Sequence, residues 1–195
     1  MLDVSGHHGM AESAFIVRIP EAEAWIGPLR ARYDPVVELG VPAHITLVYP
    51  FMSPESIGES EWNAIRAVCR AFRPFEISFE RIERFSSSLY LAPEPSAPLV
   101  GLIEALVRAF PDYPPYGGQF ETIIPHLTVA GDAASLDVAE AELVRIMGRR
   151  GPIVATCSQM ELYENSAGVW RPLRSFGFAG NRSPELDGSP NDVPS

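Results

Sequence analysis

Hydrophobic and polar residues alternate along this chain in short segments that predict strands and helices in turn. Residues 15–20 (FIVRIP) form a short apolar run closed by a proline, which is typical of a strand. The acidic stretch that follows suits the first turn of a helix, because carboxylates there oppose the helix dipole. A second strand is predicted from His44 to Tyr49, followed by a helix after Ser53 and a third strand at residues 75–79.

The second half of the chain repeats this order of elements. Strands are predicted at residues 89–93 and from His126 to Val129, with an apolar helical stripe between them. A second helix follows, residues 152–164 read as one strand, and residues 175–179 are a candidate closing strand. The apolar positions that mark the two helices are Leu99, Leu102, Ile103, Leu106 and Phe110, then Leu136, Leu143 and Met147.

Both halves therefore read as strand, helix, histidine-bearing strand, helix and strand, at about residues 14–80 and 88–165. A duplicated unit buries the apolar faces of both copies in one shared assembly, so we expect a single bilobal domain over residues 14–179 with two lobes facing each other across a cleft. Residues 1–13 are expected to form a flexible segment. Residues 180–195 are polar, rich in proline and glycine and without periodicity, which predicts a disordered tail.

Composition narrows the classes of function that remain. The formal charge of −10 argues against a tight grip on long nucleic acid, which depends on many cationic contacts to phosphates. All fifteen basic residues are arginine, which excludes a lysine-dependent phosphate loop and any lysine–nucleotide intermediate. The two cysteines, Cys69 and Cys157, have no metal-binding spacing, and Cys69 falls on an apolar helix face. No apolar run is long enough to cross a bilayer and no secretory signal is evident, so we expect a cytoplasmic protein.

The chemistry is concentrated in one motif that occurs twice, as His44-Ile45-Thr46-Leu47 and His126-Leu127-Thr128-Val129. Because side chains alternate across a strand, each motif presents an imidazole and a hydroxyl on one face and anchors two apolar residues on the other. A single motif of this kind is an ordinary strand. The chain has four histidines, however, of which His7 and His8 lie in the N-terminal segment, and both of the others carry the motif at the same place in each unit.

Paired imidazoles suit acid–base chemistry at a phosphate. A free imidazole has a pKa of about 6.5, so one histidine can remove a proton from water while a second, protonated one delivers a proton to the leaving oxygen. The hydroxyls of Thr46 and Thr128 can donate to the non-bridging phosphate oxygens. This scheme requires no metal, and no third ligand stands at a suitable spacing to complete a metal site with His44 and His126.

With these two motifs and the repeat around them, over roughly residues 14–178, the sequence resembles the 2H phosphoesterase superfamily, which includes 2′-5′ RNA ligase-like proteins and cyclic phosphodiesterases. The resemblance implies an α+β fold of two lobes, with antiparallel sheets related by a pseudo-twofold around a central cleft and helices outside. It also implies that His44, Thr46, His126 and Thr128 form the active site. Family members open 2′,3′-cyclic or related cyclic phosphates, and some join or cleave 2′-5′ linkages.

Two further residues are candidates for substrate contacts. Several relatives carry a basic or aromatic residue soon after the second motif, whereas this chain has Ala130-Gly131. Tyr49, after the first motif, could stack on a base, although strict alternation places it on the face away from His44 and favours a packing role. Arg171, in the turn-like stretch 168–176, is the candidate for an extra phosphate donor, with a solvated surface arginine as the alternative.

Three functions remain open after this reading. The first is a metal-independent hydrolase without a cofactor, acting on the cyclic phosphate of a small nucleotide or an RNA terminus. The second is an RNA 2′-5′ ligase that uses the same histidines, with a ribose hydroxyl in place of water. The third is a module that binds nucleotides without turning them over, which the loss of one histidine would have favoured, yet both are present.

Overall fold

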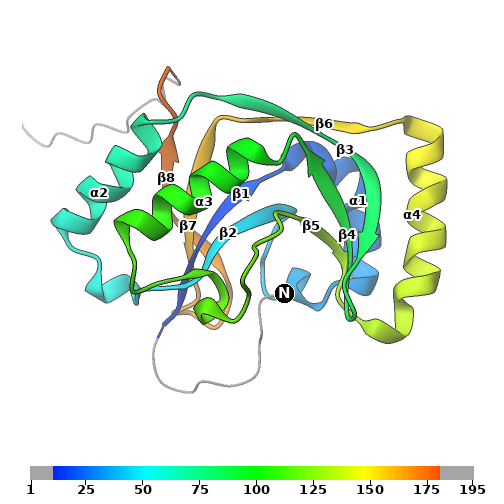
Figure 1. The fold of residues 1–195 in the computed structure, drawn as a ribbon. Helices are drawn as coiled ribbons and strands as arrows, with labels where there is room; N and C mark the ends of the chain where they lie inside the picture. The colour runs from blue at the N-terminus through cyan, green and yellow to red at the C-terminus, as the bar shows by residue number, and fades with distance from the viewer. Residues whose placement is uncertain (1–10, 181–195) are drawn as a thin grey trace, which may run out of the picture.

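The computed structural model describes residues 11–180 of the chain. The sequence-based expectations for residues 1–10, with His7 and His8, and for residues 181–195 lie outside the described part. Within it, eight strands form two four-stranded sheets, and every strand pairing is antiparallel. Four α-helices cover the sheets (Figure 1). This is the α+β fold with two antiparallel sheets that the family resemblance implied.

Both sheets share one design, with a histidine motif at the edge. Sheet A has the order β2 (His44–Phe51), β1 (Ser13–Arg18), β7 (Gln159–Glu164) and β8 (Arg171–Gly177). Sheet B has the order β5 (Leu127–Ala130), β4 (Leu89–Glu94), β3 (Phe75–Arg84) and β6 (Ile153–Cys157). The strand of the first motif, β2, and the strand of the second, β5, are therefore the equivalent edge strands of the two sheets.

The repeat in the sequence does not coincide with the two sheets, because the halves of the chain exchange strands. β3 closes the first half but pairs with β4 in sheet B, and β7 closes the second half but pairs with β1 in sheet A. The segment predicted as one strand over residues 152–164 breaks at Ser158, so that β6 joins sheet B and β7 joins sheet A. At the break, the backbone N–H of Phe178 donates to the Ser158 carbonyl at 2.9 Å. The chain thus crosses between the sheets where periodicity alone shows only a continuous strand.

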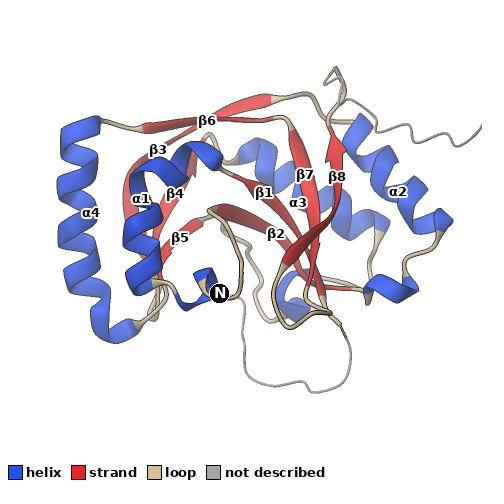
Figure 2. Cartoon of the chain, turned by 180° about the vertical axis from the view of Figure 1, so that it is seen from behind, coloured by secondary structure: helices blue, strands red, loops and turns tan. Residues whose placement is uncertain are grey.

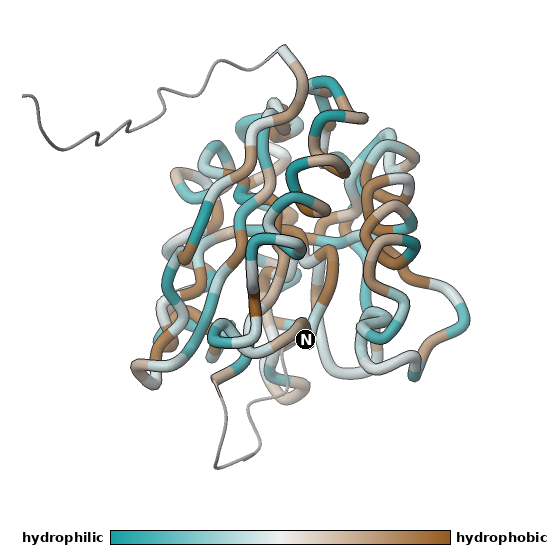
Figure 3. The backbone as a smooth tube through the Cα atoms, turned by 90° about the vertical axis from the view of Figure 1, so that its left-hand side faces the viewer, coloured by the Kyte–Doolittle hydropathy of each residue, from teal (hydrophilic) through white to brown (hydrophobic). Residues whose placement is uncertain are grey.

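The helices are exchanged in the same way and pack on the outer faces of the sheets (Figure 2). Helix α1 (Pro20–Tyr33) packs with α4 (Leu136–Arg150), and both contact strands of sheet B. Helix α2 (Glu59–Arg70) packs with α3 (Ala97–Ala109), α2 against β8 and α3 against β2 of sheet A. Hydrophobic and hydrophilic positions alternate within these elements (Figure 3), and the apolar ones meet in a core shared by both sheets.

Two element boundaries differ from the sequence-based prediction. The helix predicted after Ser53 starts instead as a single 3-10 turn, Pro54–Ser56, and α2 begins at Glu59 after Gly58, whose N–H donates to the Glu61 carboxylate at 2.9 Å. The predicted closing strand is longer than its apolar part, since β8 already begins at Arg171. The start of α2 is delayed to the residue after its cap at Gly58, whereas β8 is extended toward its N-terminus by pairing with β7.

No helix within residues 11–180 is both long and apolar enough to cross a bilayer.

Both cysteines are buried, Cys69 in the core as expected, and burial raises the pKa of each thiol to about 12.

Candidate active site

His44 is held at the start of β2 by two hydrogen bonds of its own ring. Nδ1 lies 2.8 Å from the Pro42 carbonyl oxygen, and Nε2 lies 3.1 Å from the Thr46 hydroxyl oxygen. A carbonyl can only accept a hydrogen bond, so Nδ1 carries the proton and Nε2 is the unprotonated nitrogen. The Thr46 hydroxyl therefore donates to Nε2. Thr46 lies two residues on, on the face of the strand that carries His44, as alternation predicted.

His126 repeats this arrangement on the other sheet. Its Nδ1 lies 2.7 Å from the Ile124 carbonyl oxygen, which again leaves Nε2 unprotonated. The ring packs edge-on against Phe85, with centroids 5.0 Å apart, and against Tyr90 at 5.3 Å. Assigned strand structure starts at Leu127, one residue later than predicted, and Thr128 pairs with Tyr90 in the sheet. The carbonyl two residues before each histidine thus sets the same tautomer in both motifs.

The fold brings these two motifs to one place. The edge strands β2 and β5 contact each other although they belong to different sheets (Figures 1 and 2). The imidazoles are close enough for the charge of His126 to contribute to the low pKa of His44. The fold therefore brings close together two motifs that are about 80 positions apart in the chain.

Burial changes the charge state of both imidazoles. The pKa of His44 is lowered to about 3, first by burial and then by the positive charge of Arg30. Burial likewise lowers the pKa of His126 to about 4. At neutral pH both rings are neutral in this structure, which differs from the expectation of one neutral and one protonated histidine drawn from the ordinary value of about 6.5.

These low pKa values predict how the stability of the protein depends on pH. Between about pH 6.5 and pH 4 the unfolded chain binds more protons at His44 and His126 than the folded chain does. We therefore expect their contribution to the free energy of unfolding to be complete above pH 6.5 and to be lost as the pH falls through this window. Urea unfolding at a series of pH values measures it. The variant H44Q/H126Q should show a shallower decline, and an unchanged slope would contradict the prediction.

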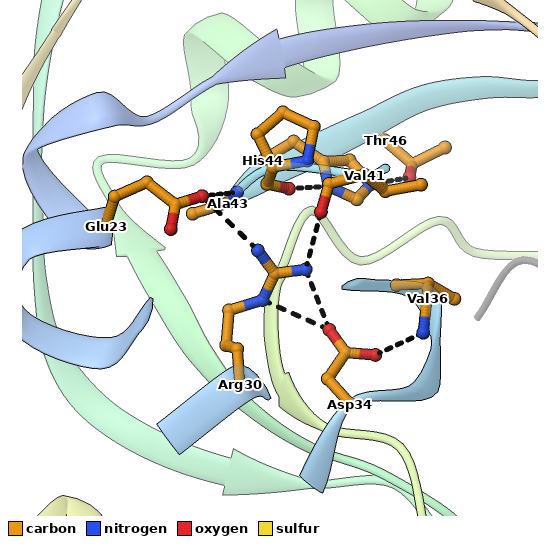
Figure 4. A network of polar contacts seen from close by, with 9 residues as sticks. Glu23, Arg30, Asp34, Val36, Val41, Ala43, His44 and Thr46 are labelled. Carbon is orange, nitrogen blue, oxygen red and sulfur yellow. Dashed lines mark hydrogen bonds and ion pairs between the residues drawn. The ribbon is translucent and has the colours of Figure 1, made fainter. Parts of the chain in front are cut away.

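A buried ion-pair network behind His44 fixes the loop that leads into β2 (Figure 4). The guanidinium of Arg30, in α1, donates to the Asp34 carboxylate at 2.8 Å and to the Val41 carbonyl at 3.4 Å. Arg30 and Asp34 are both buried. The Glu23 carboxylate lies 3.6 Å from Arg30 and accepts a hydrogen bond from the N–H of Ala43, the residue before His44. Helix α1 therefore holds both the position and, through Arg30, the charge state of His44.

Cross-strand pairing places one arginine next to the first motif. Arg18 pairs with His44 in the register of β1 and β2, so both side chains lie on the same face as direct neighbours. Its guanidinium is 3.8 Å from the Glu161 carboxylate of β7, and its side chain is 41% exposed. Arg18 is not recognisable as a site residue from sequence, because it ends an ordinary apolar strand and its proximity to His44 depends on strand order.

The two candidates for substrate contacts lie elsewhere in sheet A. Arg171 begins β8, at the opposite edge from β2, where its guanidinium bonds the buried Glu164 carboxylate and the Ser166 hydroxyl. Tyr49 is buried in apolar packing, with its ring 5.8 Å from Trp170 and its hydroxyl donating to Glu12 at 3.0 Å.

Strict alternation does not hold for Tyr49. The register of β1 and β2 shifts between Phe15 and Ile16, and Tyr49 packs in the same cluster as Ile16, the partner of Thr46. An irregularity of this kind, like a β-bulge, interrupts the alternation of side chains between the two faces of a strand. Residues after it can then lie on the face opposite to the one that strict alternation predicts. Tyr49 therefore shares the face of Thr46, within a packed apolar cluster.

One further residue comes near the first motif from a loop that, in the sequence, indicates only a connection between elements. Tyr116 lies in the 3-10 segment Pro115–Gly118 between α3 and β5, and this segment contacts β2, the strand of the first motif. The signal in the sequence is weak: an aromatic residue inside a proline- and glycine-rich loop ten residues before His126.

Two other features of the described residues bear on ligands. A cavity of about 470 Å³ lies between α3 and residues 115–123, and none of the four motif residues lines it. Within residues 11–180, no group of three or more histidine, cysteine, aspartate or glutamate side chains is placed to hold a metal ion. The cavity therefore lies apart from the residues of the two histidine motifs.

Comparison with solved structures shows where else this fold occurs. A structure titled as E. coli LigT complexed with NADP+ matches with a TM-score of 0.55, covering 87% of this chain and 98% of the other at 20% identity. A structure of TT0787 from Thermus thermophilus matches with a TM-score of 0.53, covering 87% and 98% at 18% identity. At these identities the likeness concerns the fold.

Sequence comparison shows the family. A Bacillus cytotoxicus protein named "Putative phosphoesterase Bcer98_0945" is 31% identical over 124 residues, which cover 62% of this chain and 66% of that protein. A similarly named protein of Halalkalibacterium halodurans is 26% identical over 151 residues, 75% of this chain and 85% of the other. The sequence model of the 2′-5′ RNA ligase superfamily matches residues 19–168, which include both histidine motifs. The chain therefore belongs to the 2′-5′ RNA ligase superfamily, the family that its two motifs predicted.

Proposed function

We propose that this protein is a phosphodiesterase that opens the 2′,3′-cyclic phosphate, or a related cyclic phosphate, of a small nucleotide or an RNA terminus. The observation that carries the proposal is the matched state of the two imidazoles. Each donates a hydrogen bond from Nδ1–H to a backbone carbonyl, so each has an unprotonated Nε2. Two such nitrogens suit a reaction in which one proton is removed and another is delivered.

In the proposed reaction a water oxygen attacks phosphorus and one ribose oxygen leaves. One histidine takes the proton of the water on Nε2, and the other, protonated, gives its proton to the leaving ribose oxygen. Because both rings are neutral at neutral pH, the acid must gain its proton when the anionic substrate binds, since a neighbouring negative charge raises the pKa of an imidazole. No step uses a metal ion.

The surroundings of the two rings favour different roles. The positive charge of Arg30, in the network behind His44, lowers the pKa of His44 in addition to burial, whereas burial is the main cause at His126. We therefore assign His44 as the base and His126 as the acid. Thr46 and Thr128, on the same strand faces, would donate to the non-bridging phosphate oxygens, where charge increases in the transition state. For Thr46 this requires that substrate binding replaces its hydrogen bond to His44 Nε2, which also frees that nitrogen to act as the base.

The relatives support a small phosphate ester as substrate. The curated relatives named above carry the name phosphoesterase. Structures of E. coli LigT with the same fold are titled as complexes with 3′-AMP and with phosphate. A nucleotide of this size needs only a few local donors, which agrees with the acidic charge of this chain.

The experiment that tests the proposal offers the protein 2′,3′-cyclic nucleotides and short RNAs with cyclic ends, in the presence of a chelator. We expect ring opening to a 2′- or 3′-phosphate at an unchanged rate with and without the chelator. Joining of a cyclic end to a ribose hydroxyl, without hydrolysis, would establish the 2′-5′ ligase instead. Tight binding of 3′-AMP without turnover of any cyclic phosphate would establish the binding module.

Substituting Arg18 tests which arginine binds the phosphate of the substrate. We expect Arg18→Gln to raise the KM for a 2′,3′-cyclic nucleotide by about tenfold or more, the scale of one lost charge-assisted hydrogen bond, because Arg18 is the cross-strand partner of His44. The matched control is Arg171→Gln, which removes the same group at the opposite edge of sheet A. Steady-state kinetics measure both. A larger effect at Arg171 would show that the phosphate lies nearer β8.

A further inference from the structure

A buried glutamate lies beside the arginine that neighbours the first motif. Glu161, in β7, is 3% exposed, and its carboxylate lies 3.8 Å from the Arg18 guanidinium. Glu161 pairs with Ile16 of β1, and Arg18 lies two residues beyond Ile16, so both charged side chains share one face of sheet A as diagonal neighbours. On its other side, Arg18 pairs with His44. The carboxylate, the guanidinium and the imidazole therefore lie in this order on the neighbouring strands β7, β1 and β2.

The contact with Glu161 leaves the N–H groups of Arg18 available to a ligand. At 3.8 Å it is an ion pair but not a hydrogen bond. Within residues 11–180, the Arg18 guanidinium donates no hydrogen bond to another residue. Arg171 differs, because its guanidinium already donates to Glu164 and Ser166. A guanidinium with free N–H groups can bind two oxygens of one phosphate, so Arg18 has the donors that a phosphate site requires.

Stability alone does not explain the buried carboxylate of Glu161. A buried carboxylate loses its hydration, and a single ion pair seldom compensates for that loss. Near a site for an anionic substrate, its charge also opposes binding. The carboxylate is nevertheless fixed in place, since Gln159 Nε2 donates to it at 2.9 Å. The structural consequence of this fixed charge is the direction of the Arg18 side chain.

Sheet B repeats the arrangement beside the second motif. Glu83, in β3, accepts a hydrogen bond at 2.9 Å from the hydroxyl of Tyr90 in β4, and Tyr90 pairs with Thr128 in β5. Glu83 and Glu161 occupy the same place, since each lies on the third strand from the motif edge, opposite the partner of the motif threonine. In each sheet, a glutamate therefore contacts a side chain of the second strand that is the direct partner of a motif residue.

We infer that Glu161 is a positioning residue: it holds the Arg18 guanidinium beside His44, where the guanidinium binds the phosphate of the substrate. This inference rests on the proposed function. Glu161 acts on binding in two opposite ways, because its charge repels the phosphate while its contact with Arg18 lowers the cost of ordering that side chain. With positioning as the larger effect, removal of the charge weakens substrate binding. With repulsion as the larger effect, it strengthens binding.

The test is Glu161→Gln, which keeps the size of the side chain and an acceptor for Gln159 but removes the charge. With 2′,3′-cyclic AMP as substrate, we expect KM to rise by about threefold to tenfold, the scale of ordering one flexible side chain, with kcat within about twofold. The double variant Arg18→Gln/Glu161→Gln should have the KM of Arg18→Gln alone, because Glu161 acts through Arg18.

The matched control is Glu164→Gln. Glu164 is also a buried carboxylate of β7 that pairs with an arginine, but its partner Arg171 lies on β8, at the opposite edge of sheet A from His44. This variant should leave the KM unchanged. Urea unfolding of both variants shows whether any change in KM follows a loss of stability.

Calorimetric titration with 3′-AMP separates this inference from the proposed function, because it measures binding without turnover. We expect Glu161→Gln to weaken binding by about threefold to tenfold here as well. Binding as tight as that of the wild type, or tighter, would overturn the role of Glu161, while ring opening by the wild type upholds the function. If the wild type binds 3′-AMP but opens no cyclic phosphate, the proposed function fails, and the affinity of Glu161→Gln still decides whether Glu161 positions Arg18. A wild type that does not bind 3′-AMP would overturn both.

Discussion

Replacing either His44 or His126 by alanine is expected to lower turnover of a 2′,3′-cyclic nucleotide by at least about a hundredfold, the usual scale for losing acid–base help. The reason is that each ring supplies an Nε2 that the other cannot replace, one for proton removal and one for proton delivery. Because the two act as a unit, the double variant should be scarcely slower than the slower single variant. Single-turnover rates, measured with a chelator present, test this directly.

Matched controls separate loss of chemistry from loss of structure. Thr46→Ala and Thr128→Ala remove hydroxyls from the same strand faces, and each should cost about tenfold, the worth of one hydrogen bond to a charged group. All four variants should keep most of the wild-type stability, since the motif side chains contribute little to the apolar core. Turnover that survives the loss of both histidines, or that depends on added metal, would contradict the mechanism.

The second large effect is expected on stability, from Arg30. Arg30→Met should lower the free energy of unfolding by about 3–5 kcal/mol, because it leaves the buried Asp34 carboxylate without its partner. The matched control is Arg32→Met on the same helix, whose exposed pair with Glu142 is worth at most about 1 kcal/mol. Urea unfolding monitored by tryptophan fluorescence measures both changes.

Loss of Arg30 should also be visible at His44. Removing its positive charge takes away one cause of the low pKa, so the pKa of His44 should rise, as histidine NMR titration can follow. Arg30→Met combined with Asp34→Asn should regain part of the lost stability, because the orphaned charge is removed. Equal destabilisation by Arg30→Met and Arg32→Met would show that the buried network does not support the loop before β2.

Several parts of this protein were open to prediction because they depend on local spacing. The order of strands and helices followed from apolar periodicity, and the family from two His-x-Thr motifs in equivalent positions. Alternation along a strand also placed Thr46 on the face of His44, since residues two apart always share a face. Each of these properties involves residues that are near neighbours in the chain.

Other features of the fold and the site depend on contacts between distant segments, which local spacing does not predict. Strict alternation misplaced Tyr49 because the register with β1 shifts, and the segment 152–164 was divided because its halves pair with different sheets. Arg171 was the candidate phosphate donor in the sequence, but strand order places Arg18 beside His44 and Arg171 at the opposite edge of sheet A. Register and strand order are set by the packing of whole sheets rather than by any single segment.

By itself, then, the sequence determined the repeated elements, the two motifs and the family, because these depend on local periodicity and residue type. Only the tertiary structure decided the exchange of strands between the sheets, the pairing of Arg18 with His44 and the charge state of the histidines. The physical reason is that hydrogen bonding and desolvation act over a few ångströms in space. Folding brings to that distance groups that are more than 100 residues apart along the chain, such as Arg18 and Glu161, whose charged groups are 3.8 Å apart.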